Sequence, residues 1–178
     1  HGKPLMQWHL EALLAGGCPK AVVNTAWLSD HIVQKFNDVF LPEPSLNNRI
    51  ELYISEQFPN LPIVYSHEGR DFGGALETAG GIARALPLLN DVFWVLAGDV
   101  FTPGFEFSRK SVAQFVASGL LAHIWLVPNP THNPGGDFGL QDAGQCQAGL
   151  ALNLPKTDHR PRYTYSTIGL YRRALFEP

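Results

Sequence analysis

Charged residues are scarce in this chain: they make up 16% of its 178 residues, and the formal net charge is −3. Proteins that bind nucleic acid or an anionic membrane surface present a strongly basic field, and this composition offers none. We therefore expect neither nucleic acid nor a membrane among its partners. An anionic substrate would have to be held locally, by a helix end, a metal ion or a few cations.

Cysteines and long apolar runs are also nearly missing. The two cysteines, Cys18 and Cys146, are far apart and show no metal-binding spacing, so we interpret them as ordinary thiols of a reducing compartment. No apolar segment approaches the roughly 18 residues of a membrane span, and no signal peptide is visible. These absences predict a cytoplasmic location, although the sequence starts at His1 without a Met.

Hydrophobic residues, by contrast, account for 45% of the chain, which predicts one compact domain over residues 1–178. The stretch around which this domain is organised is Val92–Phe101, an apolar run that stops at Gly98-Asp99. A buried strand followed by glycine and an acid is typical of the edge of a sheet at a ligand crevice. Asp99 there is either a metal ligand or only the cap of the following turn.

The remaining pattern alternates helices and strands. Apolar periodicity and capping residues predict helices over 5–15, 29–40, 78–89 and 109–118. Runs of β-branched and aromatic residues predict strands over 21–24, 61–66, 93–97, 122–127 and 163–171. The segment 50–54 is predicted as a short helix or an edge strand, and 141–161 as a hairpin or irregular surface. The strand near residues 62–66, the helix and the strand 93–97 form a βαβ unit, which we expect to be parallel and right-handed. Their following loops would then lie at the same edge of the sheet.

Two loops have the composition of binding segments. The glycine-rich loop over 67–82 would let a backbone approach a ligand closely, or would simply be a tight strand-to-helix connection. The turn-rich segment 128–140 contains His132, a possible ligand or base, or an exposed loop histidine. In the same segment, Asp137 would accept hydrogen bonds from sugar hydroxyls or nucleate a turn.

Several short motifs, taken together, carry a family resemblance. In chain order they are Asn24-Thr-Ala-Trp-Leu28, Glu68-Gly69, Leu76-Glu-Thr-Ala-Gly-Gly-Ile82, Ala97-Gly-Asp-Val100, Gly136-Asp-Phe138 and Ser166-Thr-Ile-Gly169. In this order and spacing, over nearly the whole chain, they resemble the sugar-phosphate nucleotidyltransferases. Within that superfamily the sequence is most similar to the uridylyltransferases of bacterial cell-wall recycling, with the mannose-1-phosphate guanylyltransferases more distant.

The resemblance implies a fold and a reaction. The implied fold is α/β, a three-layer α/β/α nucleotide-diphospho-sugar transferase (Rossmann-like) fold with a mostly parallel sheet. The implied reaction joins a nucleoside triphosphate, expected to be UTP, to a sugar 1-phosphate, expected to be N-acetylmuramate 1-phosphate, and releases pyrophosphate in peptidoglycan recycling.

The resemblance also assigns residues to this reaction. Asp99 matches the family's aspartate that holds Mg²⁺, and is the expected catalytic and metal-binding residue. The residues that match the nucleotide-binding regions are Glu77, Thr78, Gly80, Gly81 and Asn24, and those that match the sugar-facing regions are Asp137, Ser166 and Thr167.

The sequence departs from the family at both ends. Members begin with a strand and a glycine-rich loop containing an arginine, then a Lys-Pro pair, and none of this precedes His1. Lys3-Pro4 does not replace that pair, because it stands where the family has a different stretch before its first helix. The family's second acidic metal ligand is absent as well, so we expect a chain truncated at both ends.

Two other classes of protein stay open at this point. The chain could be a regulatory domain that binds a nucleotide sugar without catalysis, which would show binding without pyrophosphate release. It could also be a metal-dependent phosphohydrolase that uses Asp99, which would release free phosphate instead. Neither alternative explains the ordered set of motifs.

Overall fold

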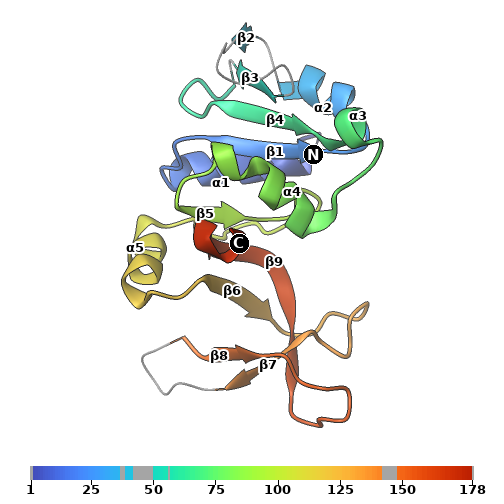
Figure 1. The fold of residues 1–178 in the computed structure, drawn as a ribbon, viewed down its shortest axis with the longest axis vertical. Helices are drawn as coiled ribbons and strands as arrows, with labels where there is room; N and C mark the ends of the chain where they lie inside the picture. Colours follow the sequence, from blue (N-terminus) through green and yellow to red (C-terminus); the bar gives the residue numbers. More distant parts are fainter. Residues whose placement is uncertain (1, 37–38, 42–49, 56, 142–147, 178) are drawn as a thin grey trace.

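The computed structural model describes residues 2–36, 39–41, 50–55, 57–141 and 148–177 (Figure 1). The described α-helices all lie in the first two thirds of the chain, among strands, and strands dominate the last third. The helices are α1 (Leu5–Ala15), α2 (Ser29–Phe36), α3 (Glu68–Phe72), α4 (Glu77–Ala85) and α5 (Arg109–Ser118), with short 3₁₀ turns η1 (Leu86–Leu88) and η2 (Arg173–Leu175). The strands are β1 (Ala21–Thr25), β2 (Val39–Leu41), β3 (Ile50–Ile54), β4 (Ile63–His67), β5 (Val92–Val95), β6 (Ala122–Val127), β7 (Phe138–Gln141), β8 (Leu150–Leu152) and β9 (Arg162–Arg172).

The first sheet has the strand order β1-β4-β3-β2. β1 and β4 are parallel, and their last residues, Thr25 and His67, lie opposite each other. β3 runs antiparallel to both of its neighbours, β4 and β2. All five residues of β4 are buried, as expected for an apolar strand inside a sheet covered on both faces.

The second sheet is built around the long strand β9. β9 pairs antiparallel with β5, β6 and β7, and β7 continues into a hairpin with β8. The predicted strand over 163–171 is thus confirmed. The segment 141–161, predicted as a hairpin or irregular surface, contributes β8 to a hairpin whose first strand, β7, lies mostly in the segment 128–140 that was predicted as a loop; residues 142–147, including Cys146, lie outside the described part of the chain.

The predicted mostly parallel sheet is wrong. Among the strand pairs that the described residues form, only β1–β4 is parallel. The strands of the predicted βαβ unit, β4 and β5, belong to different sheets, because β5 pairs with β9 and not with a strand of the first sheet. Nevertheless β4, β1 and β5 follow one another with their arrowheads pointing the same way (Figure 1), so their carboxyl ends still lie on one side of the molecule.

Two apolar clusters sandwich β5. Phe93 packs with Ile82 of α4 and with Leu86, whereas the next residue, Trp94, faces a larger cluster that includes Leu10 of α1 and Phe107. Successive side chains of a strand point to opposite faces, so β5 forms a middle layer between these clusters. The ring of Trp94 lies 5.1 Å from those of Phe107 and Trp125.

The apolar face of α1 differs from the predicted one. Leu5, Trp8, Leu10, Leu13 and Leu14 were expected on one side, but Leu5 and Trp8 are about two-fifths exposed. The buried residues are His9, Leu10 and Leu13. Because apolar residues occur almost all around this helix, the sequence pattern did not define which stripe faces the core.

Smaller differences concern the region after α2. The helix was predicted to reach residue 40, yet it ends at Phe36, and residues 39–41 form β2. The segment 50–54 is a strand, as one alternative had it, but an interior strand and not an edge. None of the described helices has the length and apolar character needed to span a bilayer.

Candidate functional site

Buried polar groups gather at the carboxyl ends of β1 and β4. The hydroxyl of Thr25 and Nδ1 of His67 lie 3.1 Å apart, and both residues are almost fully buried. The next residue, Glu68, is also buried and begins α3. Polar groups are buried at such a strand end only when hydrogen bonds compensate their lost hydration, so this region is held in a defined arrangement.

The predicted nucleotide-binding residues of α4 lie next to these groups. Gly81 is buried, and a Cβ built on it would lie 2.5 Å from Oε1 of Glu68 and 2.6 Å from Nδ2 of Asn24. A side chain at position 81 would thus displace Glu68 and Asn24 before it reached any ligand. Gly80 is restricted as well, since its Cβ would lie 2.9 Å from Cβ of Leu76.

The first residues of α4 are available to a ligand. Glu77 and Thr78 are exposed, and Glu77 has a left-handed backbone with φ of 58°. Non-glycine residues in this conformation are uncommon and often occur at binding sites. The structure thus places Asn24, Glu77, Thr78, Gly80 and Gly81 around one helix start.

Asp99 lies in the turn after β5. It is exposed, and its carboxylate makes no hydrogen bond or ion pair with the described residues. The turn is attached to α1, because the Trp8 and Phe101 rings meet edge to face at 5.6 Å. The turn is therefore anchored to α1, while the carboxylate of Asp99 itself is free of polar contacts with the described residues.

The donor set at Asp99 fits a magnesium ion that is shared with a substrate. Carboxylate oxygen is a ligand that Mg²⁺ prefers, and Mg²⁺ commonly uses one or two carboxylates together with substrate phosphates and water. Within the described part of the chain there is no group of three or more His, Cys, Asp or Glu side chains that could hold a metal alone. Asp99 would accordingly need phosphate oxygens to complete the coordination.

A bulge in β9 carries Ser166 and Thr167. Ile124 of β6 pairs with Gly169 and Leu126 pairs with Tyr165, so one residue of β6 faces three residues of β9. Thr167 has φ of 67°, and its buried hydroxyl has no hydrogen-bond partner among the described residues. Bulges and strained residues are concentrated at functional sites. Since Val95 pairs with Gly169, the bulge lies close to the turn of Asp99.

Asp137 is exposed but already engaged. One carboxylate oxygen accepts from Nδ2 of Asn133 at 3.1 Å and the other from the Tyr165 amide at 2.8 Å. Its own amide donates to the Tyr163 carbonyl. Asp137 therefore ties the loop before β7 to β9, and its remaining lone pairs are those that a sugar hydroxyl would use. His132, in the same loop, is exposed and is not joined to the other groups.

A cavity of about 230 Å³ lies beside the site, and of the predicted site residues Asn24 lines it. It runs between β1 and β5 and is lined by Asn24, Ile82 and Gly98 as well as by His9. Nε2 of His9 is buried without a partner among the described residues, and desolvation lowers the pKa of this imidazole. Asn24 at the end of β1 and Gly98 after β5 thus border one cavity, whereas the sequence had predicted only that the loops after the strands 62–66 and 93–97 share an edge.

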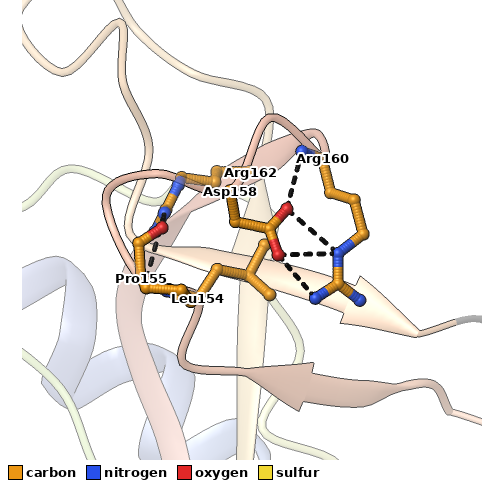
Figure 2. Close-up of polar contacts among 5 residues, drawn as sticks. All are labelled: Leu154, Pro155, Asp158, Arg160 and Arg162. Carbon is orange, nitrogen blue, oxygen red and sulfur yellow. Dashed lines mark hydrogen bonds and ion pairs between the residues drawn. The ribbon is translucent and has the colours of Figure 1, made fainter.

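The turn between β8 and β9 is fixed by a separate polar cluster (Figure 2). Asp158 accepts hydrogen bonds from the backbone, Nε and a terminal nitrogen of Arg160, and these bonds lower its pKa to about 2. Arg162 donates to the carbonyls of Leu154 and Pro155. These groups satisfy one another, so we assign them to the turn and not to the site.

Sequence reasoning missed His9 and Thr25, and it gave no role to His67 or Glu68. The burial of His9 could not be foreseen, because the apolar stripe of α1 was placed wrongly. Glu68 belongs to one of the motifs that carry the family resemblance, which was the available signal. Its neighbour Gly69 is also constrained, since a Cβ there would lie 2.1 Å from the Ala26 carbonyl oxygen.

Comparison with solved structures defines the class of fold. The crystal structure of an apo UDP-glucose pyrophosphorylase aligns with a TM-score of 0.56 and 14% sequence identity, over 98% of this chain and 67% of that one. The protein therefore shares the fold of that pyrophosphorylase. No family model matches the sequence.

Among curated proteins, the chain is similar to N-acetylmuramate alpha-1-phosphate uridylyltransferase of Neisseria meningitidis serogroup B. The identity is 36% over 183 aligned positions, which cover 99% of this chain and 65% of that protein. The predicted resemblance to the sugar-phosphate nucleotidyltransferases is thereby confirmed over nearly the whole chain. The chain itself spans just under two thirds of the relative's length.

Proposed function

We propose that the protein is a sugar-1-phosphate uridylyltransferase that joins UTP and N-acetylmuramate 1-phosphate into a nucleotide sugar and pyrophosphate, in the recycling of cell-wall sugars. The observation that carries this proposal is the 36% identity to a named uridylyltransferase over 99% of the chain. The nucleotidyltransferase fold and the free carboxylate of Asp99 at the end of β5 support it.

The chemistry is a substitution at the α-phosphorus of the nucleotide. An oxygen of the sugar phosphate forms a bond to this phosphorus, the bond to the bridging oxygen breaks, and pyrophosphate leaves with the electron pair. No general base is required, because the attacking phosphate oxygen is ionised at neutral pH. Mg²⁺, when bound, would neutralise the repulsion between the anionic oxygens, and Asp99 is the residue that would hold it.

The remaining predicted residues orient the two substrates. Glu77, Thr78 and the glycines of α4 would contact the nucleotide together with Asn24, and the close approach of the helix to Asn24 places them as one unit. Ser166, Thr167 and Asp137 would face the sugar, because the bulge of β9 and the loop tied to it lie beside the turn of Asp99. Holding both substrates in line lowers the entropic part of the barrier.

A pyrophosphate-release assay on the protein as its gene encodes it tests the proposal. We expect release with UTP, N-acetylmuramate 1-phosphate and Mg²⁺ together, and none when either substrate or the metal is omitted. Release with GTP and mannose 1-phosphate instead would identify a guanylyltransferase, and free phosphate would identify a phosphohydrolase. Binding of UTP without release would show a regulatory domain and contradict the proposal.

A further inference from the structure

Glu68 is a carboxylate that the fold buries without a cation. Only 4% of the residue is exposed, and no Lys, Arg or His of the described chain forms an ion pair with it. Burying a charged carboxylate is unfavourable unless hydrogen bonds stabilise it. Oε2 receives such a bond from the backbone amide of Leu76, at 2.9 Å.

The partner of this hydrogen bond is the residue at which α4 begins. Leu76 is the N-cap of α4, and no side chain of the helix itself caps it. A carboxylate at the positive end of the helix dipole is favourable. Glu68 therefore accepts from the N-cap amide of α4, as the N3 glutamate of a capping box does within a helix, but it does so from another element.

The other oxygen of Glu68 faces the second turn of the same helix. The point where a Cβ of Gly81 would lie is 2.5 Å from Oε1 of Glu68 and 2.6 Å from Nδ2 of Asn24. Glu68 thus touches α4 at two places, its start and Gly81, and it does so beside the end of β1. The close packing of α3 on Ala26, which Gly69 permits, keeps Glu68 at this position.

The loop between α3 and α4 has little else to define it. Gly73 ends α3 with a left-handed backbone, and a Cβ on Gly73 or Gly74 would meet nothing within 4 Å. Residues 72–75 are exposed. Phe72 and Asp71 of α3 contact Arg84 near the end of α4, but at the start of α4 the described polar contact that fixes the loop end is the bond from Leu76 to Glu68.

We infer that Glu68 is a positioning residue, which sets the conformation of the loop end and the start of α4 and thereby the places of Glu77 and Thr78. Glu68 itself is not a substrate ligand in this proposal. The inference rests on the proposed function only in assigning Glu77 and Thr78 to the nucleotide. Glu77 has a strained left-handed backbone, and Glu68 stabilises it through the hydrogen bond to the amide of the preceding residue, Leu76.

The experiment compares Glu68→Leu and Glu68→Gln with Asp71→Asn. Asp71 is a matched control, because it is a carboxylate of the same helix that joins α3 to α4 through an ion pair with Arg84 but does not contact Leu76. Glu68→Leu removes both acceptors, and we expect the KM for UTP to rise about tenfold, equivalent to ~1.4 kcal/mol, with a smaller change in kcat. Glu68→Gln keeps one acceptor and should show a smaller rise, whereas Asp71→Asn should leave this KM unchanged.

Hydrogen exchange of the amides over residues 73–81 provides a readout that does not need activity. We expect faster exchange there in Glu68→Leu, with the strands β1 and β4 still protected, and no such local change in Asp71→Asn. If the wild-type protein has no uridylyltransferase activity, the proposed function fails while this measurement still decides the role of Glu68. If the leucine variant does not fold, the glutamine variant decides in the same two measurements. Exchange and KM that match those of Asp71→Asn would reduce Glu68 to a packing residue and overturn the inference.

Discussion

Two aspartates were assigned to the site from the sequence, and at the residue scale they differ. Asp99 is exposed and makes no polar contact with the described residues, so its oxygens are available to a cation. Asp137 accepts two hydrogen bonds that hold a loop to β9. Asp99 is therefore free to hold the proposed cation, whereas Asp137 would combine any contact with a ligand with its role in holding the loop to β9.

We predict that Asp99→Asn lowers kcat/KM by about 100-fold or more while the free energy of unfolding changes by less than ~0.5 kcal/mol. The reason is that the substitution removes a metal ligand from a turn whose attachment to α1 does not use this side chain. Pyrophosphate release and thermal denaturation measure the two effects. Undiminished turnover at saturating Mg²⁺ would rule out the metal role.

Asp137→Asn is the companion variant, and it should separate the two roles. An amide can replace only one of the two accepting oxygens, so we expect a loss of about 1 kcal/mol in stability besides any rise in the KM for the sugar phosphate. Denaturant titration of both variants makes the comparison. Equal stability of the Asp137 and Asp99 variants would show that the loop does not depend on these hydrogen bonds.

At the scale of the element, β9 shows how local strain marks the site. Thr167 combines a left-handed backbone with a buried hydroxyl that has no partner among the described residues, and it lies in a bulge. A strand segment without a function would be expected to carry glycine or regular pairing at this point. This strain supports the proposal that Ser166 and Thr167 face the sugar.

We expect Thr167→Gly to leave the free energy of unfolding unchanged or to raise it by up to ~1 kcal/mol, because glycine adopts this φ without strain. Thr167→Ala keeps the backbone strain and removes the hydroxyl, which isolates the second effect. Both variants should raise the KM for the sugar phosphate. A large loss of stability in the glycine variant would mean that the hydroxyl has an essential partner within the protein.

The elements themselves were predicted well where the evidence in the sequence is local. α5 and β6 have the predicted boundaries, since Ser108 caps the helix through its hydroxyl and Gly119 ends it with a left-handed backbone. The stripe of α1 and the end of α2 were predicted wrongly. In both cases the apolar pattern was ambiguous. For α1, the tertiary neighbours decided which residues are buried. After α2, they decided that residues 39–41 form a strand.

At the scale of the whole molecule, the buried His9 and the half-buried His123 couple stability to pH. Desolvation lowers the pKa of both His9 and His123, so the folded protein favours their neutral forms. The unfolded chain binds protons near pH 6.5. The stability that these residues contribute is therefore present above about pH 6.5 and is lost as the pH falls below it.

We predict that the melting temperature falls between pH 7 and pH 5, with at most about 1.4 kcal/mol per pH unit for each histidine. Replacing His9 by Asn and His123 by Phe removes the titrating groups and should flatten this dependence. Calorimetry over the pH series measures it. The same slope in the double variant would show that other groups cause the acid sensitivity.

The sequence alone predicted most of the helices and strands, α5 and β6 with their observed boundaries, and it carried the motifs that resemble those of the sugar-phosphate nucleotidyltransferases. These conclusions depend on local propensity and on the order of short motifs, which the chain contains in itself. Only the tertiary structure decided that β5 pairs antiparallel with β9, that Thr167 lies strained in a bulge, and that Glu68 supports the start of α4. Strand partners and buried polar contacts join residues distant in sequence, and their free energy depends on packing that no local pattern specifies.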